Sequence, residues 1–307
     1  MPLPAIFYKV LDMKIDSKQG GRISDTLACR DSDSIPKVSG AGDVFMQDEC
    51  SVQRMHNGVL IHEGSYHGEW MMEIIQGLKG HHEPQEEKVF NAVLECIGSG
   101  ATMIELGSFW AYYSLWFKSR IADSRSILVE PEPDKLRAGK ENFALNEFEG
   151  TFINAFAGAN SVETAEFADW DGTRSVLPKV SIDSLMEEYK IDTLDILHSD
   201  IQGAESEMLK GASSALSEGR VKYVFISTHG HEHRKCLGKV KKYGYRIIAE
   251  HSVLESFSAD GLIVAASPNT PTPPIVSITK KDVSLLKKTR YALSFVKTKI
   301  FPPRELS

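Results

Sequence analysis

The sequence predicts an α/β fold with a mostly parallel twisted sheet and helices on both faces. Between residues 84 and 266, apolar runs of strand length alternate with amphipathic segments of helix length. The run Met103–Leu106 contains an acid, Glu105, and leads into a glycine turn. Open α/β sheets bind nucleotide-like ligands at turns of this kind, at the carboxyl ends of their strands. A second acid, Glu130, follows the next apolar run, about one helix and one strand further on.

The composition is that of a soluble globular protein with a sizeable core. Of the 307 residues, 42% are hydrophobic and 25% are charged. The formal charge of −7 argues against a nucleic-acid partner, because phosphate backbones need a basic surface. No apolar run approaches the roughly 20 residues of a transmembrane helix, and no secretory signal is evident. Four scattered cysteines without a CxxC pair indicate a reducing cytoplasm.

Residues 1–80 are predicted to form an N-terminal extension or cap. Residues 15–50 are rich in Ser, Asp, Gly and Lys, which indicates loops or partial disorder. A hairpin follows, because Asn57-Gly58 separates two apolar runs and suits a type I′ turn. Residues 66–79 are predicted to form a short helix that ends at Gly80.

Residues 81–268 are predicted to form the main domain. Strands are expected over residues 102–106, 127–130, 152–156, 164–170, 194–200, 221–227, 245–249 and 262–266. Helices are expected over residues 89–97, 109–117, 133–146, 182–189, 204–216 and 232–242. Ser181 and Pro133 are typical of helix starts. Residues 269–307 are then expected to form a proline-rich linker and a Lys-rich tail. The tail could form a solvated helix, lie on an anionic membrane surface or dock a partner.

The acids at the strand ends have two readings each. Glu105 either caps the following helix or fixes the glycine turn and meets a ligand's amine. Glu130 is either a solvated acid or an acceptor for ribose hydroxyls, and the prolines at 131 and 133 favour the second reading because they stiffen the turn.

His198 and Asp200 are predicted to point to the same face of one strand, because side chains alternate along a strand. Asp200 comes at the carboxyl end, where ligands bind in such sheets. The alternative is a buried histidine paired with a neighbouring carboxylate.

Three histidines and an acid follow the strand over residues 221–227. They could bind a metal or supply a general base, although no HExxH or paired Cys/His spacing is present. We expect one functional histidine, His229, with His231 and His233 on the solvated first turn of the next helix.

Two groups of aromatic residues are candidates for ligand contact. The cluster over residues 109–117 is typical of a core, but Trp110 and Tyr112 lie off its main stripe and near the glycine turn. The segment Trp170–Arg174 is either an ordinary turn or a polar aromatic loop that suits a sugar.

The ordered set of motifs resembles the FkbM-type S-adenosylmethionine-dependent methyltransferases. The resemblance runs from about His82 to Ala266 and includes His82-Glu83-Pro84, the segment over residues 104–107, and Val129-Glu130-Pro131. Its most specific block is Ile182-Asp183-Ser184-Leu185 followed by Asp195–Glu205, which is similar to the family's DxEGAE signature. This resemblance implies a Rossmann-like class I methyltransferase fold.

The chain departs from the family pattern at four positions. The family's GANxG turn has Phe109 in place of Asn and Ala111 in place of the last Gly, while Gln202 replaces the signature Glu and His198 replaces a Lys. The acids at 105, 130 and 200 are retained.

The resemblance implies the site residues. Glu105, Gly107 and Ser108 would approach the methionine part of the cofactor, Glu130 the ribose, and Ala155–Ala157 would border the adenine. The candidate cofactor contacts are Glu83, Glu105, Gly107, Ser108, Tyr112, Glu130, Pro131 and Ala157. The candidate substrate contacts are Trp110, Trp170, Arg174 and Gln202.

The resulting hypothesis is methyl transfer from S-adenosylmethionine to a hydroxyl of a sugar, glycan or secondary metabolite. Asp200 or His229 would act as the base, with His198 orienting or sharing the proton; alternatively, Asp200 and His229 would hold a divalent metal. A nicotinamide-dependent oxidoreductase is a second reading, which the missing GxGxxG motif disfavours. A non-catalytic binding protein is a third, which the retained Asp200 and histidines disfavour. Homo-oligomerisation stays open.

Overall fold

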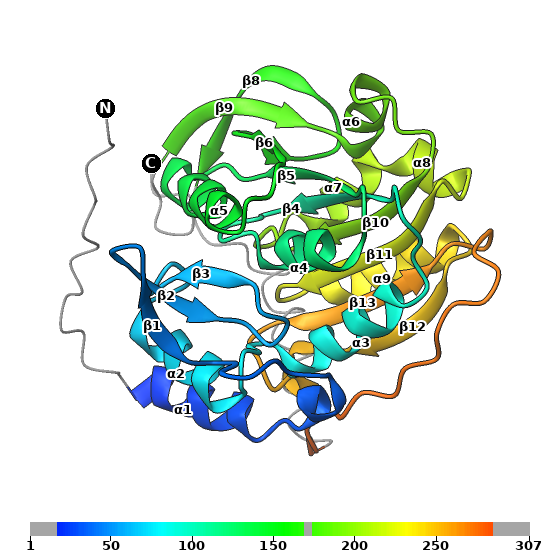
Figure 1. The fold of residues 1–307 in the computed structure, drawn as a ribbon. Helices are drawn as coiled ribbons and strands as arrows, with labels where there is room; N and C mark the ends of the chain where they lie inside the picture. The colour runs from blue at the N-terminus through cyan, green and yellow to red at the C-terminus, as the bar shows by residue number, and fades with distance from the viewer. Residues whose placement is uncertain (1–16, 169–173, 285–307) are drawn as a thin grey trace, which may run out of the picture.

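The computed structural model describes residues 17–168 and 174–284, and its centre is a seven-stranded sheet (Figure 1). The strand order is β12-β13-β11-β10-β4-β5-β6. Strands β11, β10, β4, β5 and β6 run parallel to their neighbours in that order, whereas β13 is antiparallel to both β11 and β12. The strands are β4 (Thr102–Leu106), β5 (Arg125–Val129), β6 (Thr151–Ile153), β10 (Leu194–Ser199), β11 (Val221–Thr228), β12 (Arg246–His251) and β13 (Gly261–Ala266).

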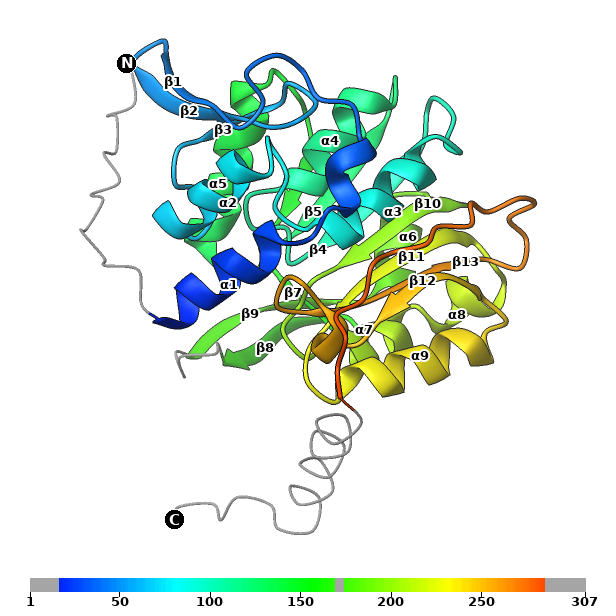
Figure 2. The ribbon, with the colours of Figure 1, turned by 90° about the horizontal axis from the view of Figure 1, so that it is seen from below.

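Helices cover both faces of this sheet, which confirms the predicted Rossmann-like fold class (Figures 1 and 2). One face carries α3 (Pro84–Leu94), α4 (Tyr112–Arg120) and α5 (Pro133–Leu145). The other carries α6 (Ile182–Glu188), α7 (Glu205–Gly211), α8 (Ser213–Ser217) and α9 (Glu232–Lys242). Successive side chains of a strand point to opposite faces of the sheet, so the protein has two hydrophobic cores. Met103 lies in the same core as Phe90 on the first face, and Ile104 lies in the same core as Leu209 on the second.

Side-chain hydrogen bonds divide two of the predicted elements. The helix expected over residues 204–216 is two helices, because the Asp183 carboxylate accepts the N–H groups of Ser214 and Ala215 at 2.9 Å and starts α8 afresh. The strand expected over residues 152–156 is divided into β6 and β7 (Phe156–Ala157). Between them, Asn154 donates to the carbonyls of Glu130 and Pro131, which bends the chain away from the sheet.

The N-terminal segment has more regular structure than its composition predicts. The expectation of loops over residues 15–50 was wrong for α1 (Ser17–Leu27), for the 3-10 helix η1 (Asp31–Ser34) and for β1 (Val44–Gln47). In α1, Arg22, Ser24 and Asp25 are exposed, while Ile23 is buried and Leu27 packs against the helix α2 (Glu69–Gly77) at Gly77. Tertiary packing therefore stabilises a helix whose overall composition is polar.

The predicted hairpin is present, with a longer turn than expected. Strands β2 (Cys50–Arg54) and β3 (Leu60–His62) pair antiparallel. The Met55 N–H donates to the Val59 carbonyl, and Gly58 has a φ of +91°. Five residues thus lie between the strands, and among them only Gly58 has a positive φ, so this is not the two-residue type I′ turn.

A small second sheet and the segment after β13 complete the described structure. Strands β8 (Val162–Ala168) and β9 (Arg174–Val180) form a small sheet with β7 in the order β7-β9-β8. After β13, residues 275–281 return across the cap, where Thr279 bonds Asp31 and Val276 packs on the core (Figure 1, orange). Within the described residues, no helix has the length and apolar character to cross a bilayer.

Candidate active site at the carboxyl edge of the sheet

Strands β4, β5, β10 and β11 all end at one edge of the sheet, called here the carboxyl edge. The turn after β4 fits this edge tightly, because Gly107 has a φ of +70° and a Cβ there would lie 1.8 Å from the carbonyl oxygen of Asp200. The N–H groups of Gly107 and Ser108 both point to the Val129 carbonyl. The Ser108 Oγ is buried and has no hydrogen-bond partner among the residues that the structure describes. A buried hydroxyl of this kind fits a ligand group in the turn.

The two residues at which this turn departs from the family pattern keep a left-handed backbone. Phe109 has a φ of +41° and Ala111 a φ of +64°. Asn and Gly adopt this region more easily than Phe or Ala do. The turn therefore keeps a conformation that suits Asn and Gly while carrying an aromatic side chain.

Glu105 makes the contact of a helix-capping acid. Its side chain is buried, and Oε2 accepts the N–H of Ser114 in the first turn of α4 at 3.0 Å. Burial raises the pKa of Glu105, while His198 and the Ser114 hydrogen bonds lower it. The carboxylate thus fixes the start of α4 beside the glycine turn.

Glu130 follows β5, and its buried carboxylate faces the same turn. Oε2 accepts the N–H of Phe109 at 3.1 Å, and Oε1 accepts the N–H of Glu132 at 2.9 Å. A carboxylate has about four acceptor positions, so two remain for a ligand. Burial raises the pKa of Glu130 to about 7, against the lowering effect of these two hydrogen bonds. Pro131, which follows, is half-buried.

Asp200 and His229 follow the last residues of β10 and β11. They lie close together because these two strands are parallel neighbours. His229 Nε2 lies 3.4 Å from Asp200 Oδ1 and 3.1 Å from Asp260 Oδ1. Its Nδ1 bonds the buried Glu205 carboxylate at 2.6 Å. The N–H direction of Nε2 fits neither aspartate, so within the described part of the chain this buried atom makes no well-aligned hydrogen bond.

Charge interactions shift the proton equilibria of this pair. Burial lowers the pKa of His229, but the nearby Asp260 carboxylate and the hydrogen bond with Glu205 outweigh it and raise the pKa to about 11. Burial and the like charge of Asp260 raise the pKa of Asp200 to about 8. His229 is therefore a cation near neutral pH, and the raised pKa makes the Asp200 carboxylate a stronger base than an exposed aspartate.

His198 has a different partner from the one its strand position suggested. Its Nε2 bonds Glu86 of α3 at 2.8 Å, and Ser227 donates to the other Glu86 oxygen at 3.0 Å. The ring lies between Tyr113 and Phe225, at centroid distances of 4.2 and 6.0 Å. This is the buried histidine–carboxylate pair of the alternative reading, in contact with Glu86 and not with Asp200.

An aromatic stack lines the glycine turn on the side of the cap. Tyr66 stacks on Trp110 at 4.4 Å between centroids, and Trp110 stacks on Tyr112 at 4.9 Å. Trp110 and Tyr112 are buried, and the Tyr112 hydroxyl bonds His56 of the cap at 2.9 Å. Tyr66, only partly buried, is the member of the stack nearest to solvent.

The remaining predicted site residues lie around this centre. Glu83 accepts the Tyr113 hydroxyl at 3.0 Å, and Gln202 lies exposed with Nε2 at 3.4 Å from Asp200 Oδ1. Ala157 is buried in β7 against the second core. Arg174 is exposed at the start of β9, beside Glu166. Trp170 lies outside the described residues.

The neighbouring histidines differ in exposure. His231 is exposed, as expected, and contacts Glu232. The expectation that His233 lies on a solvated turn was wrong, because its ring is buried and bonds Thr228 and Glu250 at 2.8 Å each. Glu232, the first residue of α9, is buried as well, so the helix already packs inward at its first turn.

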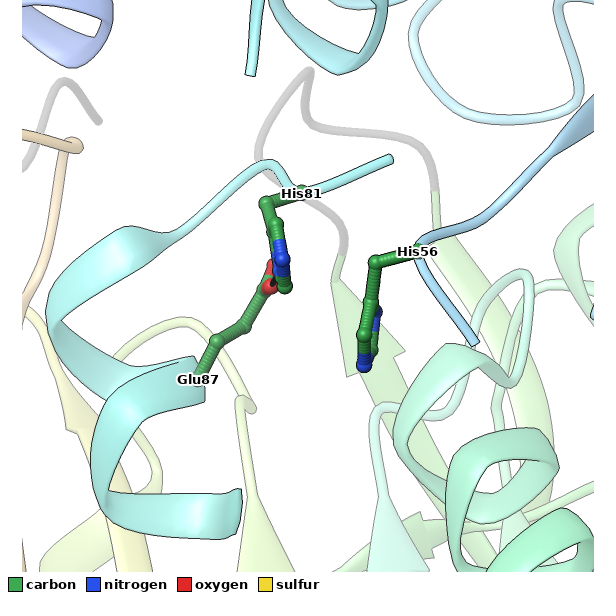
Figure 3. A group of neighbouring side chains, drawn as sticks. All are labelled: His56, His81 and Glu87. Atoms are coloured by element: carbon green, nitrogen blue, oxygen red, sulfur yellow. Dashed lines mark hydrogen bonds and ion pairs between the residues drawn. The ribbon is translucent and has the colours of Figure 1, made fainter. Parts of the chain in front are cut away.

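A separate buried group, His56, His81 and Glu87, brings possible metal ligands within 4.8 Å of one another. Figure 3 shows the two imidazole rings face to face, with centroids 4.2 Å apart and planes at 19°. Imidazole lone pairs lie in the ring plane, so nearly parallel stacked rings do not aim two nitrogens at one ion. The Glu87 carboxylate already accepts the N–H groups of His82 and Glu83 and contacts His81. The group is a hydrogen-bonded junction between the cap and α3.

Sequence reasoning missed Asp260 and gave no role to Glu205. Asp260 immediately precedes β13, and because β13 is antiparallel to β11, it arrives beside His229. Asp260 and Gly261 precede the last apolar run in the sequence. They would predict an acid beside His229 only if β13 were already known to run antiparallel to β11.

Comparison with known proteins identifies the domain. The family model described as the methyltransferase FkbM domain matches residues 93–247. No curated protein matches the chain. Among solved structures, precorrin-6y C5,15-methyltransferase from Geobacter metallireducens is 14% identical with a TM-score of 0.40, over 59% of this chain and 88% of that chain.

Two other solved structures have comparable similarity. TrmK of M. capricolum, in complex with S-adenosyl-homocysteine, is 12% identical with a TM-score of 0.40, over 69% of this chain and 82% of that one. The ribosomal protein L11 methylase of Lactobacillus delbrueckii subsp. bulgaricus is 11% identical with a TM-score of 0.39, over 61% and 80%.

Proposed function

The chain belongs to the FkbM methyltransferase family, and on this premise we propose that it transfers a methyl group from S-adenosylmethionine to a hydroxyl of a sugar, glycan or secondary metabolite. The observation that carries the proposal is the meeting of Asp200 and His229 at the carboxyl edge, where Asp200 also touches the turn at Gly107. A cofactor in that turn would present its methyl group toward the acid–histidine pair.

The residues around the turn fit S-adenosylmethionine. The two free acceptor positions of Glu130 suit the two ribose hydroxyls, and the unpartnered Ser108 Oγ suits a polar group of the methionine part. Glu83, Tyr112, Pro131 and Ala157 would flank the cofactor, with Ala157 towards the adenine. Glu105 would act indirectly, by fixing α4 beside the turn.

The proposed reaction is an in-line displacement. The acceptor oxygen forms a bond to the methyl carbon while the bond between methyl and sulfur breaks, and S-adenosylhomocysteine leaves. The hydroxyl proton passes to the Asp200 carboxylate, whose raised pKa of about 8 makes it a stronger base than an exposed aspartate. His229, held by Glu205, stands beside Asp200 and stabilises its ionised form.

The acceptor we propose is neutral and hydroxyl-bearing. The carboxylates of Glu83 and Asp260 place negative charge at this edge, and both raise the pKa of Asp200. An anionic acceptor, including a nucleic acid, would be repelled. The partly exposed Tyr66 and the aromatic residues behind it suit the apolar face of a sugar ring.

Calorimetric titration with S-adenosylmethionine, S-adenosylhomocysteine and NAD tests the cofactor. Heat with both adenosyl ligands and none with NAD is expected; heat with NAD alone would favour an oxidoreductase. Methyl transfer from labelled cofactor to panels of sugars, glycans and RNA then tests the acceptor, and labelling confined to RNA would overturn the hydroxyl-bearing small acceptor.

Three variants test the base. Asp200→Asn is expected to lower kcat by about 10²–10⁴-fold while cofactor affinity is retained, and His229→Ala is expected to lower kcat as well. Asp192→Asn is the matched control, because Asp192 is exposed before β10 at the opposite edge. Full turnover in both site variants would contradict the assignment.

A metal-assisted version of this reaction uses the same atoms. His229 Nε2, Asp200 and Asp260 are nitrogen and oxygen donors of the type that bind divalent cations, and Glu205 holds the second ring nitrogen as carboxylates do behind metal-bound histidines. Loss of activity with a chelator, restored by Mg²⁺ or Mn²⁺, would favour this version over the free base.

A further inference from the structure

Phe109, in the glycine turn after β4, is held by two aromatic rings of the cap. Tyr66 lies edge-on to the Phe109 ring, with centroids 5.2 Å apart and planes at 70°, and His67 lies edge-on at 5.3 Å and 79°. On the domain side, the Lys135 ammonium lies 5.1 Å from the centroid of the same ring. The Phe109 N–H donates to Glu130, so one residue connects the proposed ribose acid to the cap.

Both cap rings belong to residues 63–68, called here the cap loop, which join β3 to α2. Three positions of this loop have a left-handed backbone, with φ values of +68°, +53° and +74° at Gly64, His67 and Gly68. Glycine adopts this conformation freely, whereas histidine adopts it seldom and at some cost. Such a residue persists where surrounding contacts fix it, and residues of this kind cluster at ligand sites.

Asn142 of α5 ties the start of the cap loop to the glycine turn. Its buried amide accepts the His62 N–H at 2.9 Å and donates to the Trp110 carbonyl at 3.0 Å. Tyr66 also stacks on the Trp110 ring, at 4.4 Å between centroids with the planes at 12°. Backbone and ring contacts thus place the cap loop against the same turn at which we propose that the cofactor binds.

The cap loop reaches both ends of the proposed cofactor path. Burial raises the pKa of Tyr66, and nearby carboxylates that include Asp200 raise it further, so this ring lies beside the reaction centre. Burial and nearby cations that include Lys135 lower the pKa of His67 to about 4, so this ring is neutral and lies towards α5. A ligand that ran from Glu130 to Asp200 would therefore pass beside both rings.

The two rings also carry polar groups that are open to a ligand. Neither the Tyr66 hydroxyl nor a ring nitrogen of His67 makes a hydrogen bond to another residue within the described ranges 17–168 and 174–284. Tyr66 is partly exposed and His67 is exposed. Together with the unpartnered Ser108 Oγ, they offer hydrogen-bonding groups from both the cap and the turn.

We propose that the cap loop forms a wall of the S-adenosylmethionine site, in which Tyr66 and His67 contact the cofactor and Phe109 is the positioning residue that holds the loop against it. The inference rests on the proposed binding of the cofactor at the glycine turn. Because Tyr66 lies beside Asp200, its ring borders the sulfur end of the cofactor and the acceptor beyond it. The cap is therefore a part of the ligand site and not only an extension of the domain.

Phe109→Asn removes the ring but suits the backbone, because asparagine adopts the left-handed region more easily than phenylalanine does. In calorimetry, the affinity of this variant for S-adenosylhomocysteine is expected to fall about 10-fold, since two edge-to-face contacts with the cap loop are lost. Phe45→Asn is the matched control and should bind as wild type, because Phe45 is a partly buried phenylalanine of the cap strand β1 with Arg54 over its ring at 4.6 Å. Wild-type affinity in Phe109→Asn, or an equal loss in Phe45→Asn, would overturn the proposal.

Tyr66→Ala approaches the same contact from the cap side. If Phe109 acts by holding the cap loop, Tyr66→Ala should weaken the binding of S-adenosylhomocysteine less in the Phe109→Asn background than in wild type. Strictly additive losses in the double variant would show that Phe109 does not act through the loop, which removes its proposed role.

Hydrogen exchange of the backbone amides in residues 63–68 gives a measurement that needs no methyl transfer. In wild type, S-adenosylhomocysteine is expected to slow this exchange about 10-fold or more, and the ligand-free Phe109→Asn protein should exchange faster than ligand-free wild type. Unchanged exchange of the cap loop in wild type while the ligand binds would refute the inference and leave the cofactor in place.

Two further outcomes separate the inference from the proposed function. If the cap loop is protected by S-adenosylhomocysteine in a protein that methylates no hydroxyl, the inference stands and the proposed acceptor falls. If wild type binds neither adenosyl ligand, the inference and the proposed cofactor fall together.

Discussion

Gly107 and Asp200 are in backbone contact, since a Cβ on Gly107 would lie 1.8 Å from the Asp200 carbonyl oxygen. The Asp200 N–H also donates to the Leu106 carbonyl at 3.0 Å. The end of β4, which we propose holds the cofactor, is thus joined directly to the end of β10, which carries the proposed base. A shift at one strand end must move the other.

Gly107→Ala is expected to separate these strand ends. The side chain would overlap the Asp200 carbonyl in a backbone with a φ of +70°, and we expect a loss of about 2–4 kcal/mol in the free energy of unfolding, together with loss of cofactor binding. Denaturant unfolding and calorimetry measure both. Gly238→Ala in α9 is the control, because nothing lies within 4 Å of a Cβ there and a helical alanine should stabilise by about 0.5–1 kcal/mol. Equal stability of the two variants would contradict the contact.

Glu130 is expected to make cofactor affinity depend on pH. Burial raises the pKa of Glu130 to about 7, and only the ionised carboxylate accepts from both ribose hydroxyls. Affinity for S-adenosylmethionine should therefore rise as the pH increases through 7. Glu130→Gln should bind about 10- to 100-fold more weakly with a flat profile, whereas Glu132→Gln, in which the Glu132 N–H remains, should behave as wild type in calorimetry. A flat wild-type profile would remove Glu130 from the ribose site.

Glu250 is expected to stabilise the fold above acid pH. A hydrogen bond from His233 at 2.8 Å and the Lys280 ammonium at 3.1 Å lower the pKa of Glu250 to about 2, against the opposing effect of burial. A lowered pKa gives stability that is present above the unfolded value near 4.5 and is lost as the pH falls towards 2.

Between pH 5 and pH 2, wild type should therefore lose on the order of 2 kcal/mol more unfolding free energy than Glu250→Gln, after allowance for solvent screening. Glu166→Gln, at an exposed ion pair, is the control and should follow wild type. Parallel acid unfolding of wild type and Glu250→Gln would refute this contribution.

His82 is expected to stabilise the junction of cap and domain up to alkaline pH. Burial lowers the pKa of His82, but the carboxylates of Glu83 and Glu87 outweigh it and raise the pKa to about 10. A raised pKa gives stability that is complete below the unfolded value near 6.5 and is lost as the pH rises through 10. His82→Gln should be several kcal/mol less stable than wild type at pH 6, and the difference should shrink by pH 10.

The exposed His231→Gln is the matched control, with a constant, small effect expected at every pH. Unfolding free energies of the three proteins across this range make the measurement. A gap between wild type and His82→Gln that stays constant to pH 10 would show that His82 acts through packing alone.

Much of the candidate site was predictable from the sequence, because its residues directly follow apolar strands. Glu130, Asp200 and His229 each come one residue after a strand, and parallel strands bring such positions to one edge. The turn at Gly107 was predictable for the same reason. Local pattern and strand direction together determine these positions, with no knowledge of distant contacts.

Other features depend on packing between segments that are far apart in the chain. The partner of His198 is Glu86, 112 residues away, and it takes the histidine out of the contact with Asp200 that strand alternation suggested. The helix α1 forms in a polar segment because α2 and the core bury one of its faces. Such partners leave no local pattern in the sequence.

The sequence by itself determined the α/β class, the family resemblance and the strand ends where chemistry can occur, because each of these follows from the short-range alternation of apolar and polar residues. The tertiary structure decided which charges meet. Asp260 reaches His229 only because β13 is reversed and Gly261 allows a close approach, and Glu205 fixes the other side of the ring. Proton affinities depend on through-space charge and burial, so the roles within the acid–histidine pair became visible only in three dimensions.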